Sequence, residues 1–184
     1  MNIRAARLND VTSIYTLVAE HAHRGDVLPR TLASIRDSVD DWIVVDQGGQ
    51  IVGCASLLAY TSELAEVRSL AVHDQCKGNG FGAAILQALI AEAQQRNIPT
   101  LFALTRAVPF FQRAGFVIGD KARFPEKIWR DCVLCPVRDE CDETAVVLEL
   151  ESVPHLANTD PNEPAKDVFG NLPSSMKIEI WATS

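Results

Sequence analysis

The chain of 184 residues has 24 acidic and 17 basic side chains, which gives a formal net charge of −7 at pH 7. Hydrophobic residues make up 47% of it and charged residues 22%, proportions typical of one soluble globular domain. Nucleic acids and anionic membranes bind basic surfaces, so this charge argues against both as partners. We find no apolar run of the roughly 20 residues that a membrane span needs, no signal peptide, and an odd number of cysteines. The sequence therefore predicts a cytoplasmic protein.

The first half of the chain predicts a strand, two helices and an antiparallel meander. Apolar residues at helical spacing follow Asn9 and Asp10, which are typical helix N-caps. Two strand-like runs flank Gly48-Gly49, and paired glycines supply the positive φ angles of a tight hairpin. The predicted elements are a strand at 3–6, helices at 11–18 and 31–38, and strands at 41–46, 50–60 and 63–73.

The second half predicts a parallel crossover followed by further antiparallel strands. A glycine-rich loop at 74–82 leads into an amphipathic helix with Ile85 and Leu89 on its apolar face, and a strand follows. The remaining predicted elements are strands at 100–105, 116–118 and 144–151, a helix at 109–114 and a helical turn at 125–131. We expect an α/β protein of the α+β type, with a mixed, mostly antiparallel sheet of about seven strands flanked by helices.

Two parts are predicted along the chain. Residues 1–151 form the main domain, and residues 152–184 form a C-terminal extension that packs on it. The extension is rich in Pro, Asn and Asp and ends in an alternating segment, 177–181, which predicts an extra C-terminal strand.

The glycine-rich loop is the most informative stretch of the sequence. Because it joins a strand end to a helix start, free backbone N–H groups and the positive end of the helix dipole converge there on an anion site. Gly78, Gly80 and Gly82 allow the main chain to approach a ligand closely, and Lys77 adds a positive charge. The glycine spacing differs from the dinucleotide fingerprint and from the P-loop. The alternative is an ordinary helix that begins with a glycine-rich turn.

This loop resembles the acyl-coenzyme A signature of the GNAT N-acetyltransferases, Gln/Arg-x-x-Gly-x-Gly/Ala, which Gln75, Gly78 and Gly80 match. The element order and the ending Phe110-Phe111-x-x-x-Gly115-Phe116 are similar as well, so the resemblance covers residues 1–151. It implies the GNAT fold, with acetyl-coenzyme A as co-substrate and its pyrophosphate on the loop amides. The coenzyme-binding residues that it implies are Leu70, Ala71, Val72, Gln75, Cys76, Lys77, Gly78, Asn79, Gly80, Phe81, Gly82 and Phe111.

Three further segments, 25–30, 66–72 and 110–150, the last with its run at 125–136, resemble short, free-standing amino-acid N-acetyltransferases of the N-acetylglutamate synthase type. The resemblance implies acetylation of the α-amine of a small amino acid, first of all L-glutamate for arginine biosynthesis. Arg106 departs from the aromatic residue of many short homologues. Glutamine, another metabolite or a protein N-terminus stays open as acceptor, and so does a non-catalytic coenzyme A-binding or thiol-sensing protein. A homodimer is compatible with the sequence.

Acetyl transfer to an ammonium group needs a base that removes a proton. Strand alternation puts Glu66 and Arg68 on one face and Val67 and Ser69 on the other. The resemblance implies that Glu66 is the general base and that Thr105 protonates the leaving thiolate. The alternatives are an exposed carboxylate paired with Arg68 and a purely structural threonine.

An acidic acceptor needs cations for its carboxylates, and arginine pairs with a carboxylate through two hydrogen bonds. The resemblance assigns substrate binding to Arg30, with Arg68 and Lys127 as secondary candidates.

Three cysteines, Cys132, Cys135 and Cys141, begin a spacing that is typical of zinc ribbons, with His155 as the nearest fourth ligand. A structural zinc, a redox-sensitive pair of the first two thiols, and plain thiols stay open. A zinc site usually has four ligands, and this spacing supplies only three, so plain thiols are favoured.

Overall fold

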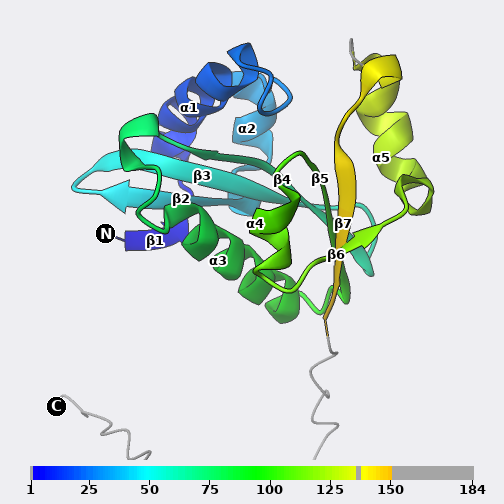
Figure 1. Ribbon diagram of the computed structural model, residues 1–184. Coiled ribbons are helices and arrows are strands. Elements are labelled where there is room, and N and C mark those ends of the chain that lie inside the picture. Colours follow the sequence, from blue (N-terminus) through cyan, green and yellow to red (C-terminus); the bar gives the residue numbers. More distant parts are fainter. Residues whose placement is uncertain (1, 136–137, 151–184) are drawn as a thin grey trace, which may run out of the picture. The chain divides into compact units, whose positions relative to one another are not determined.

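The computed structural model describes residues 2–135 and 138–150 (Figure 1). They belong to one compact unit, Met1–Val153. The predicted extension at 152–184 and its strand at 177–181 lie outside the described residues. Among the helices described, none is long and apolar enough to cross a membrane.

A seven-stranded sheet with the order β1-β2-β3-β4-β5-β7-β6 forms the centre of the described part of the chain. Its neighbours pair antiparallel except β4 and β5, which are parallel. The predicted fold class, a mixed and mostly antiparallel sheet flanked by helices, is therefore confirmed. The strands are β1 Asn2–Ala5, β2 Trp42–Gln47, β3 Gln50–Ala59, β4 Leu64–Val72, β5 Thr100–Thr105, β6 Val117–Gly119 and β7 Thr144–Glu149.

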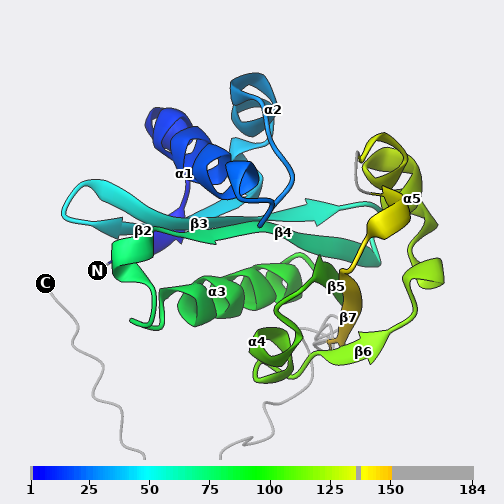
Figure 2. The same cartoon turned by 45° about the horizontal axis from the view of Figure 1, so that its top comes forward.

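Helices cover both faces of the sheet (Figure 2). The helices α1 and α2 lie on one face and α3 and α4 on the other, while α5 follows β6 along the chain. The apolar side of α3 is buried against the sheet, as its helical spacing predicted. The helices are α1 Val11–His23, α2 Leu32–Asp37, α3 Phe81–Gln95, α4 Val108–Gln112 and α5 Pro125–Arg130.

The start of α1 differs from the prediction, because Asp10 does not cap it. A 3-10 turn, Leu8–Asp10, runs directly into α1 and leaves Asp10 in a helical conformation, φ −85° and ψ −15°. Its carboxylate instead accepts from Arg4 Nη1 at 2.7 Å and from the backbone N–H of Arg7 at 2.7 Å. The carboxylate thus links β1 to the turn that precedes the helix.

The parallel strands β4 and β5 separate after only three paired residues. Leu64, Ala65 and Glu66 pair with Thr100, Leu101 and Phe102, and no further pairs follow. The second half of β4 therefore has free backbone groups on the side of β5. This separation positions the functional site.

A bulge interrupts β4 just beyond the separation. The register against β3 shifts there, and Ser69 takes a left-handed conformation with φ 54°. The predicted alternation fails at this residue: Val67 packs in the core against α3, whereas the Oγ of Ser69 accepts from Arg30 Nε at 3.4 Å. The extra residue of the bulge turns Ser69 to the side of Arg30.

Candidate active site

A cavity of about 820 Å³ opens where β4 and β5 separate. The segment after α1, the glycine-rich loop and α4 contribute to its walls. The predicted site residues among its lining are Arg30, Glu66, Arg68, Leu70, Val72, Cys76, Lys77, Gly78, Gly80, Phe81, Gly82, Thr105, Phe111 and Lys127. Three other predicted residues, Ala71, Gln75 and Asn79, are not among the lining residues, and Ala71 packs instead in the core with α1. The structure thus gathers most of the predicted site around one space.

The glycine-rich loop has the backbone that the sequence predicted for an anion site. Gly78 and Gly80 are left-handed, with φ of 82° and 79°, and a Cβ added at either would meet no atom within 4 Å. Gly80 directly precedes α3, a helix of 15 residues, so the free N–H groups of its first turn face this loop. A left-handed loop beside open space at a helix start suits a phosphate group.

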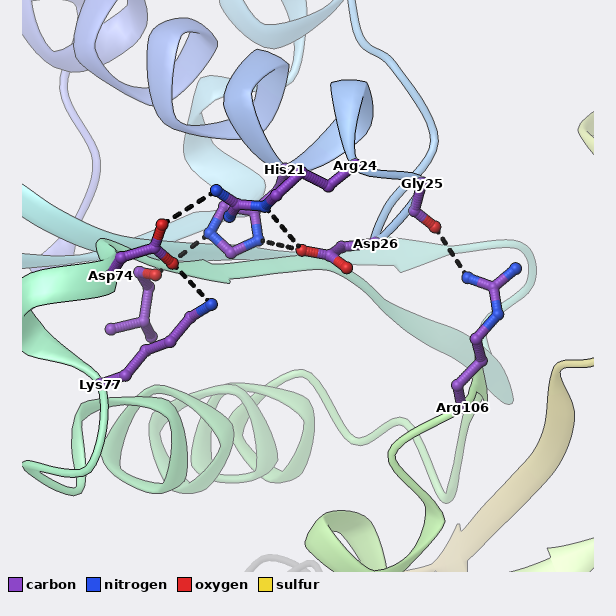
Figure 3. Close-up of polar contacts among 8 residues, drawn as sticks. His21, Arg24, Gly25, Asp26, Asp74, Lys77 and Arg106 are labelled. Carbon is purple, nitrogen blue, oxygen red and sulfur yellow. Dashed lines mark hydrogen bonds and ion pairs between the residues drawn. The ribbon is translucent and has the colours of Figure 1, made fainter.

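A buried histidine connects α1 to the end of β4 (Figure 3). His21 is 5% exposed, and its Nε2 donates to the carbonyl oxygen of Val72 at 3.1 Å. On the other side of the ring, Nδ1 lies 3.1 Å from Asp26 Oδ2. These contacts fix the segment after α1 against the strand end that lines the cavity.

The exposed charges of the glycine-rich loop are paired within the protein (Figure 3). Asp74 accepts from Arg24 Nη1 at 2.9 Å and lies 2.6 Å from Lys77 Nζ, and the lysine hydrogen bond lowers the pKa of Asp74. Lys77 therefore shares its charge with Asp74, and the backbone amides are the main anion-binding groups of the loop.

Arg106 joins the two sides of the cavity, as the right-hand part of Figure 3 shows. It directly follows β5, and its Nη1 donates to the carbonyl oxygen of Gly25, after α1, at 2.7 Å. Its Nε donates to Asp142 Oδ1 at 2.6 Å. The sequence marked this arginine only as a departure from its relatives, since nothing in one chain pairs position 106 with position 25.

Glu66 lies in a buried ion pair at the end of the cavity beside α5. It is 2% exposed, with Oε1 2.8 Å from Lys127 Nζ and Oε2 accepting from the Tyr60 hydroxyl at 2.8 Å. Burial beside this carboxylate raises the pKa of Tyr60, so its hydroxyl stays protonated and donates. The alternative of an exposed carboxylate paired with Arg68 is therefore wrong. The sequence did not single out Tyr60.

Two arginines face this end of the cavity, and in the described part of the chain neither has a carboxylate within hydrogen-bond distance. Arg30 Nη2 lies 3.6 Å and Arg68 Nη1 3.9 Å from Asp131 Oδ2, beyond hydrogen-bond distance. Asp131 is instead bound by Lys127 at 2.7 Å. Within the described residues the buried Nη1 of Arg68 has no hydrogen-bond partner, and burial lowers the pKa of this arginine. An arriving carboxylate would satisfy this buried donor.

The β5 side of the cavity supplies one hydroxyl and one further carboxylate. Thr105 ends β5, and its Oγ1 accepts from the backbone N–H of Ala107 at 2.9 Å, which leaves its own hydrogen free to donate. Glu143, directly before β7, lines the cavity and is half-buried, and burial raises its pKa. The sequence did not identify Glu143, because only the pairing of β5 with β7 brings it here.

The cysteine cluster does not form a metal site in the part of the chain that is described. Within residues 2–135 and 138–150, no three His, Cys, Asp or Glu side chains are grouped to hold a metal ion. Cys132, Cys135 and Cys141 are free thiols, and Cys141 Sγ lies 3.5 Å from Lys121 Nζ. The fourth predicted ligand, His155, lies outside the described residues.

Comparison with known proteins identifies the family. The model of the acetyltransferase (GNAT) family matches residues 8–116, more than half of the chain. The chain belongs to the GNAT acetyltransferase family. The predicted family, enzyme class and acyl donor are thereby confirmed, and this GNAT enzyme is an acetyl-coenzyme A-dependent N-acetyltransferase.

Curated relatives of this GNAT protein include free-standing and longer enzymes. The uncharacterized N-acetyltransferase CT2212 of Chlorobaculum tepidum is 38% identical over 80% of this chain and 96% of its own. An amino-acid acetyltransferase of Mycobacterium tuberculosis is 34% identical over 62% of this chain and 67% of its own. That of Pasteurella multocida is 31% identical over 68% of this chain but only 29% of its own, so the likeness covers less than a third of the longer enzyme.

Solved structures share the GNAT architecture. Rv2747 from Mycobacterium tuberculosis, in complex with CoA and NLQ, has a TM-score of 0.71 and 27% identity, over 82% of this chain and 100% of that one. The N-acetylglutamate synthase from Neisseria gonorrhoeae, complexed with coenzyme A and N-acetyl-glutamate, has a TM-score of 0.73 and 24% identity. The likeness covers 82% of this chain and 35% of the synthase. At 24% identity it shows the fold alone.

Proposed function

We propose that this GNAT enzyme acetylates the α-amine of a small, acidic amino acid, with L-glutamate as the first acceptor to test. The observation that supports this most directly is the pair Arg30 and Arg68, which line the cavity and have no carboxylate of the described residues within hydrogen-bond distance. Relatives named amino-acid acetyltransferase support the same class of acceptor. We also propose that this reaction belongs to arginine biosynthesis and takes place in the cytoplasm.

The acyl donor lies along the opening between the strands. The pyrophosphate of the coenzyme binds the amides of the loop at 75–82, beside the left-handed Gly78 and Gly80. The pantetheine arm follows the second half of β4, where backbone groups have no partner on β5. The thioester then reaches the part of the cavity that Glu66 lines.

The chemistry uses residues on both sides of this opening. Glu66 takes a proton from the acceptor ammonium, directly or through water, while Tyr60 and Lys127 hold its carboxylate in place. The amine nitrogen then attacks the thioester carbon, so that a C–N bond forms as the C–S bond breaks, and the nitrogen releases its second proton to solvent as the amide forms. Thr105 donates its hydroxyl hydrogen to the leaving thiolate and regains a proton from solvent.

The acceptor carboxylates bind the two arginines. Lys127 is already held by Glu66 and Asp131, at 2.8 and 2.7 Å, whereas Arg30 and Arg68 are 3.6 and 3.9 Å from Asp131 and keep donors for the substrate at this end of the cavity. Two arginines suit two carboxylates that bind one each, as in glutamate, or one carboxylate that binds both. This second arrangement makes glutamine the other candidate acceptor.

The deciding experiment measures thiol release from acetyl-coenzyme A with a panel of acceptors. We expect kcat/KM to be highest for L-glutamate or L-glutamine and much lower for D-glutamate, L-lysine and a peptide with a free N-terminus. Mass spectrometry of the product shows whether the acetyl group is on the α-amine. Turnover with the peptide and none with free amino acids would overturn the proposed function.

A further inference from the structure

We propose that Glu143 binds the ammonium group of the acceptor and thereby selects substrates that have a charged amine next to a carboxylate. The proposal deepens the proposed function and rests on it. Glu66 remains the group that takes the proton, and Glu143 keeps its negative charge throughout the reaction.

The strand pairing places Glu143 on the acceptor side of the sheet. Thr144 pairs with Thr105 at the end of β5, so Glu143 lies just beyond the paired ends of both strands. Side chains alternate along a strand, and Glu143 therefore shares a face with Ala145. Ala145 packs with Phe102, which is the β5 partner of Glu66. Both carboxylates thus line the cavity from the same face of the sheet.

The two carboxylates differ in what binds them. Both oxygens of Glu66 are engaged, one by Lys127 and the other by Tyr60, at 2.8 Å each. Among the described residues Glu143 has no hydrogen bond and no ion pair. The charged groups that act on it from a distance are Arg106, Lys127, Lys121 and Glu66. Glu143 is therefore the cavity carboxylate whose oxygens are free for a ligand.

A cation at this position would remove an energetic penalty. Burying a carboxylate without a bonded partner is unfavourable, and at Glu143 burial raises the pKa for this reason. An amino acid at neutral pH offers one ammonium for each α-carboxylate. With its carboxylates on Arg30 and Arg68, its ammonium satisfies Glu143 and reaches the thioester from the side of β5.

The experiment compares Glu143→Gln with the matched variant Glu149→Gln. Glu149 lies at the far end of β7, exposed and bound to Arg123 and Thr100, so its replacement leaves the cavity unchanged. We expect Glu143→Gln to raise the acceptor KM at least 10-fold, the loss typical of a hydrogen bond between charged groups. The kcat at saturating acceptor and the KM for acetyl-coenzyme A stay within about twofold of wild type.

A second readout separates the ammonium from the carboxylates. Glutarate has both carboxylates of glutamate and no amine, so it competes with the acceptor without contacting Glu143. Its inhibition constant should be unchanged in Glu143→Gln and should rise in Arg30→Ala. If another amino acid proves the better acceptor, its own analogue without the amine replaces glutarate.

The outcomes are distinguishable. An unchanged acceptor KM in folded Glu143→Gln overturns the inference, and so does a glutarate inhibition constant that rises as much as the KM. A fall in kcat without a change in KM also overturns it, because it assigns Glu143 to the chemical step. Failure of the proposed function appears in the wild-type enzyme alone, as absent turnover with amino acids.

Discussion

The ammonium of Lys127 lies 2.8 Å from the carboxylate of Glu66, and neither side chain is more than 5% exposed. This pair attaches the short helix α5 to β4, the strand that lines the cavity. Asp131 extends it, since its carboxylate also binds Lys127. The carboxylate proposed as general base is therefore held by a helix that begins almost 60 residues later in the chain.

Lys127→Met should destabilise the protein strongly. It leaves Glu66 buried without its cation, and breaking a buried ion pair in this way costs about 3–5 kcal/mol. The double variant Lys127→Met with Glu66→Gln should regain part of the loss, because no buried charge is then left at position 66. Urea unfolding followed by circular dichroism measures both, with the half-exposed Lys77→Met as a control that changes stability by less than about 1 kcal/mol. Wild-type stability in Lys127→Met would contradict the ion pair.

Gly80→Val should weaken coenzyme binding at least 10-fold, which corresponds to about 1.4 kcal/mol. Valine at φ 79° is strained and reshapes the loop whose amides are proposed to bind the pyrophosphate. Gly48→Val, in the β2–β3 hairpin at φ 64° with the same open surroundings, reproduces the strain away from the cavity. Calorimetric titration with coenzyme A should show weaker binding for Gly80→Val alone. Equal affinities of the two variants for coenzyme A would show that the pyrophosphate site does not lie on this loop.

The sequence predicted the fold well because its strongest patterns are local. The paired glycines Gly48 and Gly49 both have positive φ and form the predicted hairpin. The strand at 100–105 has the predicted bounds, and its parallel pairing with β4 follows from the crossover between them. The prediction that Asp10 caps α1 was wrong, because the preceding 3-10 turn changes the conformation of this residue. A single sequence does not reveal where such a turn runs into a helix.

The sequence could predict only those parts of the candidate site whose residues lie in one continuous segment. The loop at 75–82 and Glu66 could be read from local motifs. Of the two partners of Glu66, Tyr60 lies six residues away across the turn between β3 and β4, whereas Lys127 on α5 meets it only through tertiary packing. Ser69 was assigned to the wrong face because the bulge in β4 adds a residue, and strand periodicity has no signal for that.

Glu66→Gln should lower kcat on the order of 10²-fold, the usual contribution of a general base, with little change in coenzyme affinity. The amide keeps the size of the side chain and can still accept from Tyr60, but it cannot take a proton from the acceptor. Steady-state kinetics against the exposed control Glu63→Gln measure the effect. Near-normal turnover at neutral pH would place the base elsewhere in the cavity.

Arg30→Ala should raise the KM for glutamate about 10–100-fold, the loss expected for a hydrogen bond between charged groups. Arg30 is 13% exposed, its Nη2 lies 3.6 Å from Asp131, beyond hydrogen-bond distance, and its hydrogen bond to Ser69 at 3.4 Å uses Nε alone. A substrate carboxylate therefore gains a fork of two hydrogen bonds there, and alanine removes it. Arg30→Lys keeps the charge without the fork and should give an intermediate KM.

The control for this prediction is Arg36→Ala, which removes an exposed arginine from the nearby helix α2. It lowers the net positive charge of the same region by one unit without touching the cavity, so a purely long-range electrostatic effect would appear in both variants. The KM for acetyl-coenzyme A should stay near the wild-type value in all three variants, because the pyrophosphate site lies on the loop at 75–82. An acceptor KM that stays at the wild-type value in Arg30→Ala would contradict the assignment of this arginine to the acceptor carboxylate, and the acetyltransferase activity would stand without it.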